Sequence, residues 1–426
     1  MRVLWFANSA SMASAHLKQV NIGGGWIESL EAEMNKVPEL DLGVVFRFGE
    51  KPIGPFSIGK TKYYPVASPQ QKGKISGLIQ RWQHKIANEE TGQYLRIIDD
   101  FKPDLIHIFG TENDFGRVIP KVSIPCILYI QGNLTVINHK WFSGFSMLDT
   151  LRYSGKSRLL KGYGYIHDYL RYKKEAAREE TIFRSGRFFM GRTDWDRRIA
   201  QALSPGSLYY HCEEMMRSQF YKQQWQQPLP GQPFTIFSTI RQNIYKGLET
   251  ILESARILKN NGSGSNIQWK VAGIQPDDEL VKMTEKKYRD SFSNNNIALL
   301  GPLPPDELVG QMLKANLFLH PSHVDNSPNS VCEAMLLGMP VLSTFAGGIP
   351  SLVADKKEGL LVQDGDPYAL AGAVLELKND PALAATLAAN ARSKALFRHN
   401  DRKITETVLH IYNSVISHTL KPVRES

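Results

Sequence analysis

The chain has 426 residues, 42% of them hydrophobic, and a formal net charge of +9 at pH 7. This length predicts two or three domains with ample core, and no apolar run approaches the roughly eighteen residues that a membrane-spanning helix needs. The three cysteines are far apart and form no CxxC pair, which excludes that kind of metal or redox site and fits a reducing cytoplasm.

The first half of the chain alternates apolar runs with helical patterns. Short apolar runs bounded by polar residues or glycine predict strands, and apolar residues that share one helical face predict helices. The predicted strands cover residues 1–7, 42–48, 62–66, 102–109, 124–130 and 187–190. The predicted helices cover residues 27–34, 91–101 and 167–183. This alternation indicates an α/β domain with a parallel sheet.

Three consecutive glycines precede the first of these helices. Because glycine lacks a Cβ atom, its backbone can approach a phosphate closely, so Gly24 and Gly25 are candidate phosphate contacts. The glycines are not spaced as G-x-G-x-x-G, so the dinucleotide-binding fingerprint is absent. A plain flexible turn is the alternative.

Polar residues also follow several predicted strands. Ligands of doubly wound sheets bind outside the carboxyl ends of the strands, which makes these residues candidates for a cleft. The candidates are Thr111, Glu112, Gln131 and Asn133. Arg192 follows a later strand and is placed either to meet a phosphate or to pair with Asp194 or Asp196. His107 lies within a strand and is predicted to be a buried core residue.

Residues 140–200 contain fourteen Lys and Arg against seven Asp and Glu, interleaved with aromatic residues. A basic and aromatic surface can meet nucleic acid, an anionic membrane or an anionic acceptor. No nucleic-acid-binding motif accompanies the charge, so a membrane surface is favoured over nucleic acid. A solvated helical face with its aromatic side chains turned into the core is the structural alternative.

The second half repeats the alternation after a Gln/Pro/Gly-rich stretch, residues 223–233, which is the predicted linker. The predicted strands cover residues 234–240, 267–272, 297–300, 316–322, 341–344 and 359–362. The predicted helices cover residues 247–258, 277–287, 305–314, 367–394 and 402–419. A second parallel, helix-covered sheet is therefore expected.

Residues 325–340 predict a short helix with both ends marked. Ser327 suits the N-cap, a proline follows at the first helical position, and a glycine suits the left-handed residue after the last turn. The preceding strand would lead to the helix N-terminus, where free N–H groups attract anions. Asp325 and Glu333 add carboxylates, which repel phosphate but accept hydrogen bonds from hydroxyl groups. N–H groups that donate hydrogen bonds to phosphate, beside carboxylates that accept them from hydroxyl groups, indicate a site for a sugar nucleotide.

Arg241 and Lys246 follow the first predicted strand of the second half. A guanidinium offers a planar fork and an ammonium offers a compact point charge. Together they can hold a diphosphate leaving group as its charge develops.

These motifs together resemble the retaining glycosyltransferase family 4. The motifs in the second half are Arg241-x4-Lys246-Gly247, His320-Pro321-Ser322, Asn326-Ser327-Pro328-Asn329-Ser330-x2-Glu333 and Gly347-Gly348-Ile349-Pro350. Residues 107–112 and 191–196 are similar to a bacterial surface-polysaccharide branch. The resemblance implies an α/β chain with the GT-B fold, in which two Rossmann-like domains face each other across a cleft. The expected parts are an acceptor-side domain, a nucleotide-sugar-binding domain and a C-terminal helix that returns to the first domain, at residues 1–215, 216–400 and 401–426.

The resemblance also implies roles for the candidate residues. Glu333 would hold the ribose hydroxyls, while Arg241 and Lys246 would hold the diphosphate; with Asp325 they form the expected catalytic group. The other expected donor contacts are Gly24, Gly25, Asn326, Ser327, Asn329 and Ser330. The expected acceptor-side contacts are Glu112, Gln131, Asn133 and Arg192. No metal or cofactor is expected, because Arg, Lys and a helix N-terminus can replace a cation on the diphosphate of a UDP- or GDP-type donor.

Two positions depart from the family's pattern. Asp325 stands where the family has a glutamate, so the carboxylate that faces the donor sugar is one methylene shorter, and sugar choice is in question. Gln131 stands where many members have a histidine, and an amide donates hydrogen bonds but does not titrate near neutral pH.

The predicted function is transfer of a sugar to a hydroxyl of a glycan or lipid-linked acceptor in cell-surface polysaccharide synthesis. The predicted location is cytoplasmic, with peripheral contact to the inner face of the membrane. Two alternatives remain open: a sugar-nucleotide 2-epimerase of similar fold, and a non-catalytic protein that binds nucleotide sugars or glycans.

Overall fold

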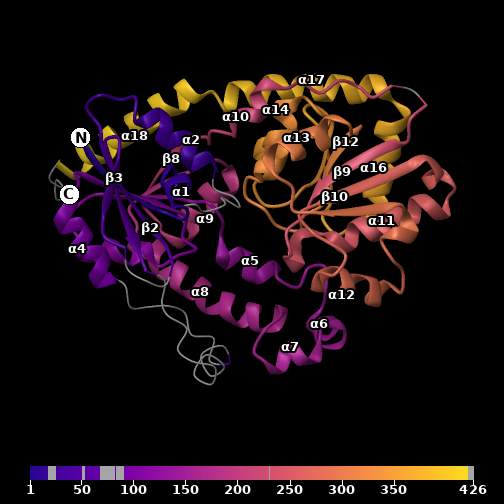
Figure 1. Cartoon of the computed structure of the whole chain (residues 1–426), viewed down its shortest axis with the longest axis horizontal. Coiled ribbons are helices and arrows are strands. Elements are labelled where there is room, and N and C mark those ends of the chain that lie inside the picture. The colour runs from indigo at the N-terminus through magenta and orange to yellow at the C-terminus, as the bar shows by residue number, and fades with distance from the viewer. Residues whose placement is uncertain (18–24, 50–52, 68–81, 83–90, 230, 421–426) are drawn as a thin grey trace. The chain divides into compact units, whose positions relative to one another are not determined.

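The computed structural model describes residues 1–17, 25–49, 53–67, 82, 91–229 and 231–420 (Figure 1). The chain forms two compact units. Unit 1 comprises residues 1–135, 171–217 and 399–426, and unit 2 comprises residues 136–170 and 218–398. Residues 136–170 therefore leave the first half of the sequence to pack with the second half.

Unit 1 is built around an eight-stranded sheet with the order β3-β4-β2-β1-β5-β6-β7-β8. Its strands are β1 (Arg2–Ala7), β2 (Asp41–Arg47), β3 (Phe56–Ile58), β4 (Thr61–Val66), β5 (Leu105–Phe109), β6 (Cys126–Tyr129), β7 (Phe188–Gly191) and β8 (Leu208–His211). β3 runs antiparallel to β4, and the other neighbours are parallel. The short β3 and β8 were not predicted, since neither carries a long apolar run.

Helices cover both faces of this sheet because its strands are apolar on both sides. In β1, Val3 and Trp5 point to one face while Leu4 and Phe6 point to the other, and all four are fully buried. The first face packs against α2 (Gly25–Met34) and α18 (Asp401–Leu420). The second face packs against α4 (Thr91–Phe101), α8 (Tyr165–Ser185) and α9 (Asp194–Leu203). The short α1 (Ala13–His16) follows β1.

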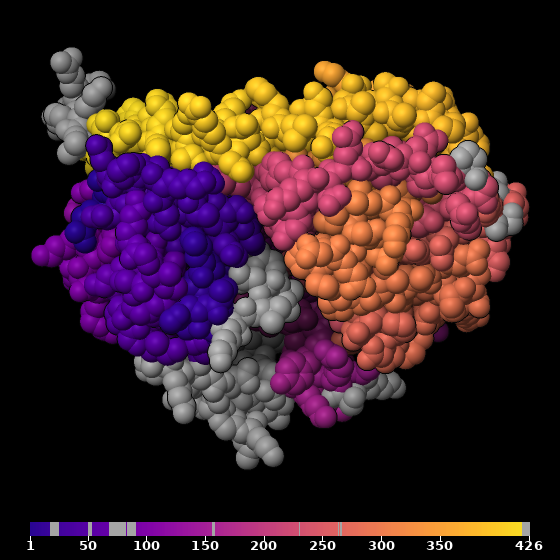
Figure 2. Space-filling view, turned by 45° about the horizontal axis from the view of Figure 1, so that its top comes forward, coloured from indigo at the N-terminus to yellow at the C-terminus, as the bar shows by residue number. Residues whose placement is uncertain are grey.

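The C-terminal helix α18 is part of the core of unit 1. In Figure 2 it is the yellow helix that lies against the indigo N-terminal residues. The Tyr412 hydroxyl lies 2.6 Å from His107 Nδ1 and accepts a hydrogen bond of 3.0 Å from the Trp5 indole. His107 is fully buried, as predicted for a core histidine, and burial lowers its pKa to about 3.

Unit 2 contains a six-stranded sheet with the order β11-β10-β9-β12-β13-β14, in which all neighbours are parallel. Its strands are β9 (Phe234–Thr239), β10 (Ile267–Ala272), β11 (Ile297–Gly301), β12 (Leu317–His320), β13 (Val341–Thr344) and β14 (Leu360–Val362). The chain starts at the central β9, builds one side of the sheet and then crosses to β12 to build the other. The order in which strands are added to the sheet therefore reverses between β9 and β12. Doubly wound sheets bind ligands at this reversal point.

The α-helices between residues 218 and 398 precede, connect or follow these strands. They are α10 (Ser218–Lys222), α11 (Leu248–Asn260), α12 (Glu279–Tyr288), α13 (Pro305–Leu313), α14 (Asn329–Leu337), α15 (Ile349–Leu352), α16 (Pro367–Asn379) and α17 (Pro381–Arg398). The single helix predicted over residues 367–394 was wrong, because Pro381 starts a new helix and the Asp380 side chain accepts a hydrogen bond from Leu383 N.

The predicted linker at residues 223–233 was also wrong, because this segment lies within unit 2. Its described residues, 223–229 and 231–233, form no helix or strand, but Trp225 anchors the segment. The indole of Trp225 donates to the carbonyl of Ala315 at 2.7 Å, and its backbone N–H donates to the carbonyl of Leu337 at 2.7 Å. One buried aromatic side chain thus fixes a stretch whose composition is typical of a linker.

Residues 136–170 contribute to helices α5 (Leu134–Lys140), α6 (Met147–Tyr153) and α7 (Lys156–Leu160), and α6 packs against α12. Lys287 of α12 joins them, since its ammonium donates to the carbonyl of Gly144 at 3.0 Å and pairs with Asp149 at 3.2 Å. In the described part of the chain, no helix combines the length and the apolar character that crossing a membrane requires.

Candidate functional site

The reversal point of the unit 2 sheet brings together the loops that follow β9 and β12. Gly247 ends the first loop and precedes α11 with a positive φ of 76°, a conformation that favours glycine. A Cβ atom at Gly247 would lie 2.1 Å from the carbonyl oxygen of Pro321 in the second loop. The two loops can therefore touch only because this residue has no side chain.

Lys246 and Asp325 form an ion pair across these loops. The Lys246 ammonium lies 2.6 Å from Oδ2 of Asp325, and His320 Nε2 lies 3.2 Å from the same oxygen. The other oxygen, Oδ1, accepts a hydrogen bond of 3.1 Å from Asn326 N. Burial acts to raise the pKa of Asp325, but the charge of Lys246 and the hydrogen bond of His320 outweigh burial and hold the pKa well below its usual range. Asp325 is thus a fixed anion that holds Lys246 in place.

A second glycine contact fixes the backbone of Asp325. Gly347 has a φ of 55°, and a Cβ atom there would lie 1.9 Å from the carbonyl oxygen of Asp325. Gly348 N donates to the same carbonyl at 2.9 Å. The Gly347–Gly348 turn of the sequence motif therefore packs against the loop that carries Asp325 and fixes its backbone.

Helix α14 begins one residue later than predicted. Pro328 is its N-cap, and no side chain caps the helix there, so the prediction that Ser327 is the N-cap was wrong. The Ser327 hydroxyl instead lies 4.0 Å from the Cys332 sulfur. The predicted C-terminal glycine is confirmed, since Gly338 is left-handed with a φ of 76°.

The other predicted donor residues of unit 2 lie at the end of β9, on helix α14 or in the turn before it. Arg241 is exposed at the carboxyl end of β9, while Glu333 is 4% exposed within α14. Asn326 and Ser327 are buried, and Asn329 and Ser330 are half-buried at the start of α14. Gly25 begins α2 in unit 1. Gly24 lies outside the described residues.

A buried charge network beneath the site was not predicted. His323 Nε2 lies 2.6 Å from the carboxylate of Glu249, and its Nδ1 lies 3.5 Å from the carboxylate of Asp364. Both ring nitrogens face carboxylates, so the imidazole is doubly protonated. Burial acts to lower the pKa of His323, but the hydrogen bonds and charges of Asp364 and Glu249 outweigh it and raise the pKa to about 9. These residues are 41 and 74 positions from His323, so no local pattern could reveal them.

The network also holds residues 136–170 against unit 2. Lys140 pairs with Asp364 at 3.8 Å, and a Cβ atom at Gly144 would lie 2.4 Å from Oε1 of Glu249. His323 N donates to the carbonyl of Tyr245 at 3.0 Å, next to Lys246. The network therefore connects the α5–α6 loop with the loop that carries Lys246.

The four predicted acceptor-side residues gather at the carboxyl ends of β5, β6 and β7 in unit 1. The Glu112 carboxylate accepts a hydrogen bond of 2.7 Å from Gly132 N, between Gln131 and Asn133. The Arg192 guanidinium donates to the Gln131 side chain at 3.2 Å and to its carbonyl at 3.3 Å. The structure thus brings together residues from three strands.

Arg192 pairs with a residue that the sequence did not suggest. Its guanidinium is 3% exposed and forms an ion pair with Glu214, which is 2% exposed, rather than with Asp194 or Asp196. Asp196 instead accepts a hydrogen bond of 3.0 Å from Arg192 N, and Asp194 pairs with Arg197 at 3.1 Å. Glu214 therefore balances the charge of Arg192, and the Arg192 side chain orients Gln131.

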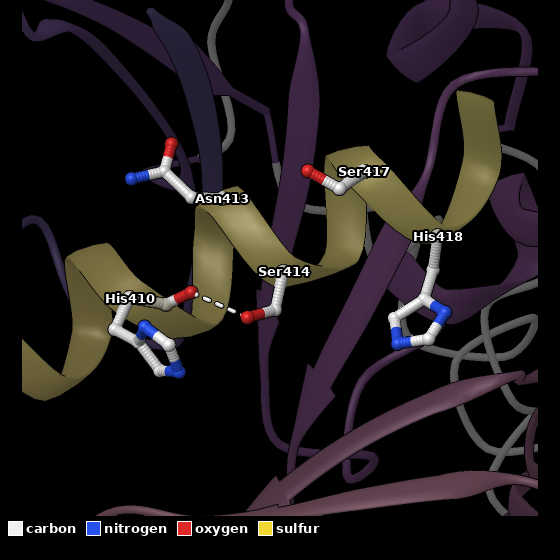
Figure 3. A pocket seen from close by; sticks show the side chains of 5 residues that line it. All are labelled: His410, Asn413, Ser414, Ser417 and His418. Atoms are coloured by element: carbon white, nitrogen blue, oxygen red, sulfur yellow. Dashed lines mark hydrogen bonds between the residues drawn. The ribbon is translucent and has the colours of Figure 1, made fainter. Parts of the chain in front are cut away.

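A surface hollow of about 290 Å³ lies elsewhere, on α18 (Figure 3). Its lining residues are His410, Asn413, Ser414, Ser417 and His418. The Ser414 hydroxyl donates to the carbonyl of His410 at 2.9 Å, so it serves the helix itself. None of these residues follows a strand of either sheet, and the hollow is separate from the predicted site residues.

In the described part of the chain, no three His, Cys, Asp or Glu side chains come together as a metal-ligand set. The chain thus has two α/β units, each built on a largely or wholly parallel sheet, with a Lys–Asp pair at the reversal point of the second sheet, where open α/β sheets bind ligands. Residues 219–394 match the family model described as "Glycosyl transferases group 1". This match covers less than half of the chain, and the two units have the GT-B architecture.

Several sequence relatives are named for bacterial surface-polysaccharide synthesis. One is the putative colanic acid biosynthesis glycosyltransferase WcaL of Salmonella typhimurium, 28% identical over 44% of this chain and 46% of the relative. Another is the amylovoran biosynthesis glycosyltransferase AmsK of Erwinia amylovora, 30% identical over 38% of this chain and 40% of the relative. The matches span less than half the length of each of these relatives.

Solved structures resemble the chain over almost its whole length. Sucrose-phosphate synthase from Thermosynechococcus elongatus has a TM-score of 0.69 at 15% identity, covering 98% of this chain and 100% of that structure. Anabaena Alr3699/HepE in complex with UDP-glucose has a TM-score of 0.63 at 14% identity, covering 97% and 100%. The predicted GT-B fold is confirmed, while the narrower assignment to family 4 stays a prediction.

Proposed function

We propose that this chain is a retaining glycosyltransferase that moves a sugar from a nucleoside diphosphate sugar to a hydroxyl group of a glycan or lipid-linked acceptor. The observation that carries the proposal is the Lys246–Asp325 pair at the reversal point of the unit 2 sheet. A cation for phosphate and an anion for sugar hydroxyls stand side by side there, as a sugar nucleotide requires. The group 1 match over residues 219–394 covers both residues.

Lys246 serves the leaving group in this proposal. Its ammonium and the exposed guanidinium of Arg241 balance the charge that develops on the diphosphate, so no metal ion or cofactor is needed. Asp325 holds the ammonium of Lys246 in position before the donor binds. Glu333 accepts hydrogen bonds from the ribose hydroxyls, and the N–H groups at the start of α14 add donors for phosphate.

Asp325 also has capacity for the donor sugar. A carboxylate offers about four lone-pair positions, and the described contacts with Lys246, His320 and Asn326 N use three of them. The remaining position, on Oδ1, can accept one sugar hydroxyl. Sugar choice therefore depends on the short side chain at this position.

The proposed chemistry needs no protein base. The bond between C1 of the sugar and the β-phosphate oxygen breaks while the acceptor oxygen bonds to C1 on the same face. The acceptor's proton passes to the departing β-phosphate oxygen, so the products are the glycosylated acceptor and a nucleoside diphosphate. Arg241 and Lys246 stabilise that leaving group.

The proposal also covers the kind of acceptor and the place of the protein in the cell. Homologues named for colanic acid and amylovoran synthesis support an acceptor in cell-surface polysaccharide synthesis. Glu112, Gln131 and Asn133, with Arg192 behind them, are proposed acceptor-side contacts. The protein is proposed to be cytoplasmic, with peripheral contact to a membrane through residues 140–200.

Incubation with UDP, GDP and ADP sugars, with and without an acceptor extract, tests the function. Free nucleoside diphosphate that appears slowly alone and faster with acceptor is the expected result. Interconversion of the donor to its 2-epimer would show an epimerase instead. Donor binding without turnover for any acceptor would show a binding protein, and either outcome would overturn the proposal.

A further inference from the structure

Helices α6 and α7 of unit 2 expose an unusual share of apolar side chains. Of the fourteen large apolar side chains exposed in the described residues, five lie between residues 147 and 163. They are Met147, Leu148, Leu151, Leu160 and Tyr163, with exposures of 47%, 77%, 41%, 71% and 45%. Figure 1 shows α6 and α7 as consecutive short helices. We call these five residues the α6–α7 patch.

The patch occupies the outer face of α6. At 100° per residue, Met147, Leu148 and Leu151 fall within one 100° arc of the helix. The opposite side holds the buried Thr150 and Asp149, and Asp149 is paired with Lys287 of α12. The inner face of α6 is thus satisfied by unit 2, while its apolar face is left in solvent.

The charges around the patch are mainly positive. Residues 147–163 contain four basic residues against one acidic residue, Asp149. Arg152 borders the apolar arc and is exposed, as is Lys161 beyond α7. Arg158 is 56% exposed and pairs with Glu279 at 3.3 Å. Exposed leucines flanked by arginine and lysine match a surface of hydrocarbon beneath anionic headgroups.

The aromatic residues of this region play a different part. Trp141, Phe145 and Tyr165 are 2%, 1% and 6% exposed, so they belong to the core of unit 2. Lys287 lies over the Phe145 ring, 4.7 Å from its centroid. These three aromatic side chains are therefore structural, while the exposed apolar surface comes from leucine, methionine and Tyr163.

We infer that the α6–α7 patch docks unit 2 on an anionic lipid bilayer, with its leucines at the acyl boundary and Arg152 and Lys161 among the headgroups. The inference rests on the proposed function only in its choice of partner, and it narrows the membrane contact from residues 140–200 to α6 and α7. Two short helices and one flanking charge cluster suit reversible peripheral binding.

Flotation of the full chain with lipid vesicles tests this inference. Vesicles of phosphatidylcholine with about 30% phosphatidylglycerol should bind the wild type at least about tenfold better than pure phosphatidylcholine, and salt should weaken the binding. The Leu148→Ser/Leu151→Ser variant should lose binding about tenfold or more. The Arg152→Gln/Lys161→Gln variant should lose the preference for anionic vesicles.

The chain offers a matched control. Leu229 and Leu396 are 80% and 41% exposed, and these exposed fractions are similar to those of Leu148 and Leu151. Both control residues belong to unit 2. The Leu229→Ser/Leu396→Ser variant should bind vesicles like the wild type. Equal loss in both double variants, or no binding of anionic vesicles by the wild type, would overturn the inference.

Two further measurements separate lipid docking from self-association and from a loss of donor binding. A dimer that the Leu148→Ser/Leu151→Ser variant converts to a monomer, without vesicle binding by the wild type, would assign the patch to a second copy of the chain and overturn the inference. Titration with nucleoside diphosphates should give the same affinity for wild type and variant. A variant that loses vesicle binding but keeps nucleotide binding therefore tests the docking surface alone. A wild type that binds vesicles but no nucleoside diphosphate would contradict the proposed function and leave the docking inference intact.

Discussion

Lys246 and Asp325 lie 79 residues apart in the sequence, and their charged atoms lie 2.6 Å apart in the folded chain. Sequence motifs placed them in one domain, and the fold shows that they form an ion pair. Asp325 is held by its side chain, through Lys246 and His320, and by its backbone, through the Gly347–Gly348 turn.

The first prediction concerns Asp325 and sugar choice. Asp325→Glu adds one methylene, which moves the carboxylate relative to Lys246 and to the free lone pair on Oδ1. We expect nucleoside diphosphate affinity within about threefold of the wild type, while the ratio of kcat/KM between two donor sugars changes about tenfold or more. Asp325→Asn keeps the side-chain size but removes the anion, so it should lower kcat for every donor. An unchanged sugar ratio in Asp325→Glu would contradict the assigned role.

The second prediction concerns Glu333 and ribose. Glu333→Gln keeps the volume of this buried side chain and removes its charge, so the fold should persist. A charge-assisted hydrogen bond contributes about 1.5–3 kcal/mol, so affinity for the nucleoside diphosphate should fall about tenfold or more. The wild type should discriminate strongly against the 2′,3′-dideoxy analogue, and Glu333→Gln should not. Glu376→Gln on the exposed face of α16 is the control and should change neither value.

The third prediction concerns pH and His323. Its pKa of about 9 in the folded chain exceeds the ordinary value of 6.5, so its protonation stabilises the fold. That contribution is complete below about pH 6.5 and is lost as the pH rises to about 9, amounting to up to about 3 kcal/mol. The groups that face the ring are Glu249 and Asp364, with Lys140 behind Asp364.

Thermal unfolding at several pH values measures this effect. The wild type should lose stability between pH 6.5 and 9, and His323→Gln should be less stable than the wild type at pH 6.5 but lose less over the same range. Parallel curves for the two proteins would show that the network does not titrate as described.

The fourth prediction concerns Gly247. Gly247→Ala places a Cβ atom 2.1 Å from the Pro321 carbonyl and forces alanine to a φ of 76°. We expect a loss of about 2–4 kcal/mol in the free energy of unfolding, together with weaker nucleotide binding, because the Lys246 loop must move. Gly372→Ala is the control: apart from the neighbouring backbone of α16, no atom lies within 4 Å of its added Cβ, so the variant should be as stable as the wild type or gain up to about 1 kcal/mol. Equal effects of the two substitutions would contradict the packing argument.

Regular periodicity made most of the fold predictable from the sequence. Long strands such as β9 and helices such as α11 and α18 have strong apolar patterns. The motifs predicted that Lys246 and Asp325 belong to one site, and the two residues do form an ion pair, while the role of Glu333 stays a prediction. Contacts between distant residues were not predictable. The association of residues 136–170 with unit 2 depends on Lys287, Gly144 and Glu249, none of which carries a local signal.

Local rules failed where tertiary contacts replaced them. Ser327 is a favourable N-cap by type, yet α14 begins after Pro328 and the serine faces Cys332. Residues 223–233 have the composition of a linker, yet Trp225 anchors them. Arg192 had two nearby aspartates, yet it pairs with the buried Glu214.

Titration of a nucleoside diphosphate into the wild type, Lys246→Gln and Lys270→Gln tests the central claim most directly. Lys270 is a half-buried lysine of β10 that contacts Gln311 at 3.4 Å, so it is a matched control. We expect Lys246→Gln to bind UDP or GDP at least about tenfold more weakly than the wild type, while the free nucleoside binds both equally and Lys270→Gln behaves as the wild type. Unchanged nucleoside diphosphate affinity in Lys246→Gln would contradict the assignment of this site to the donor's leaving group.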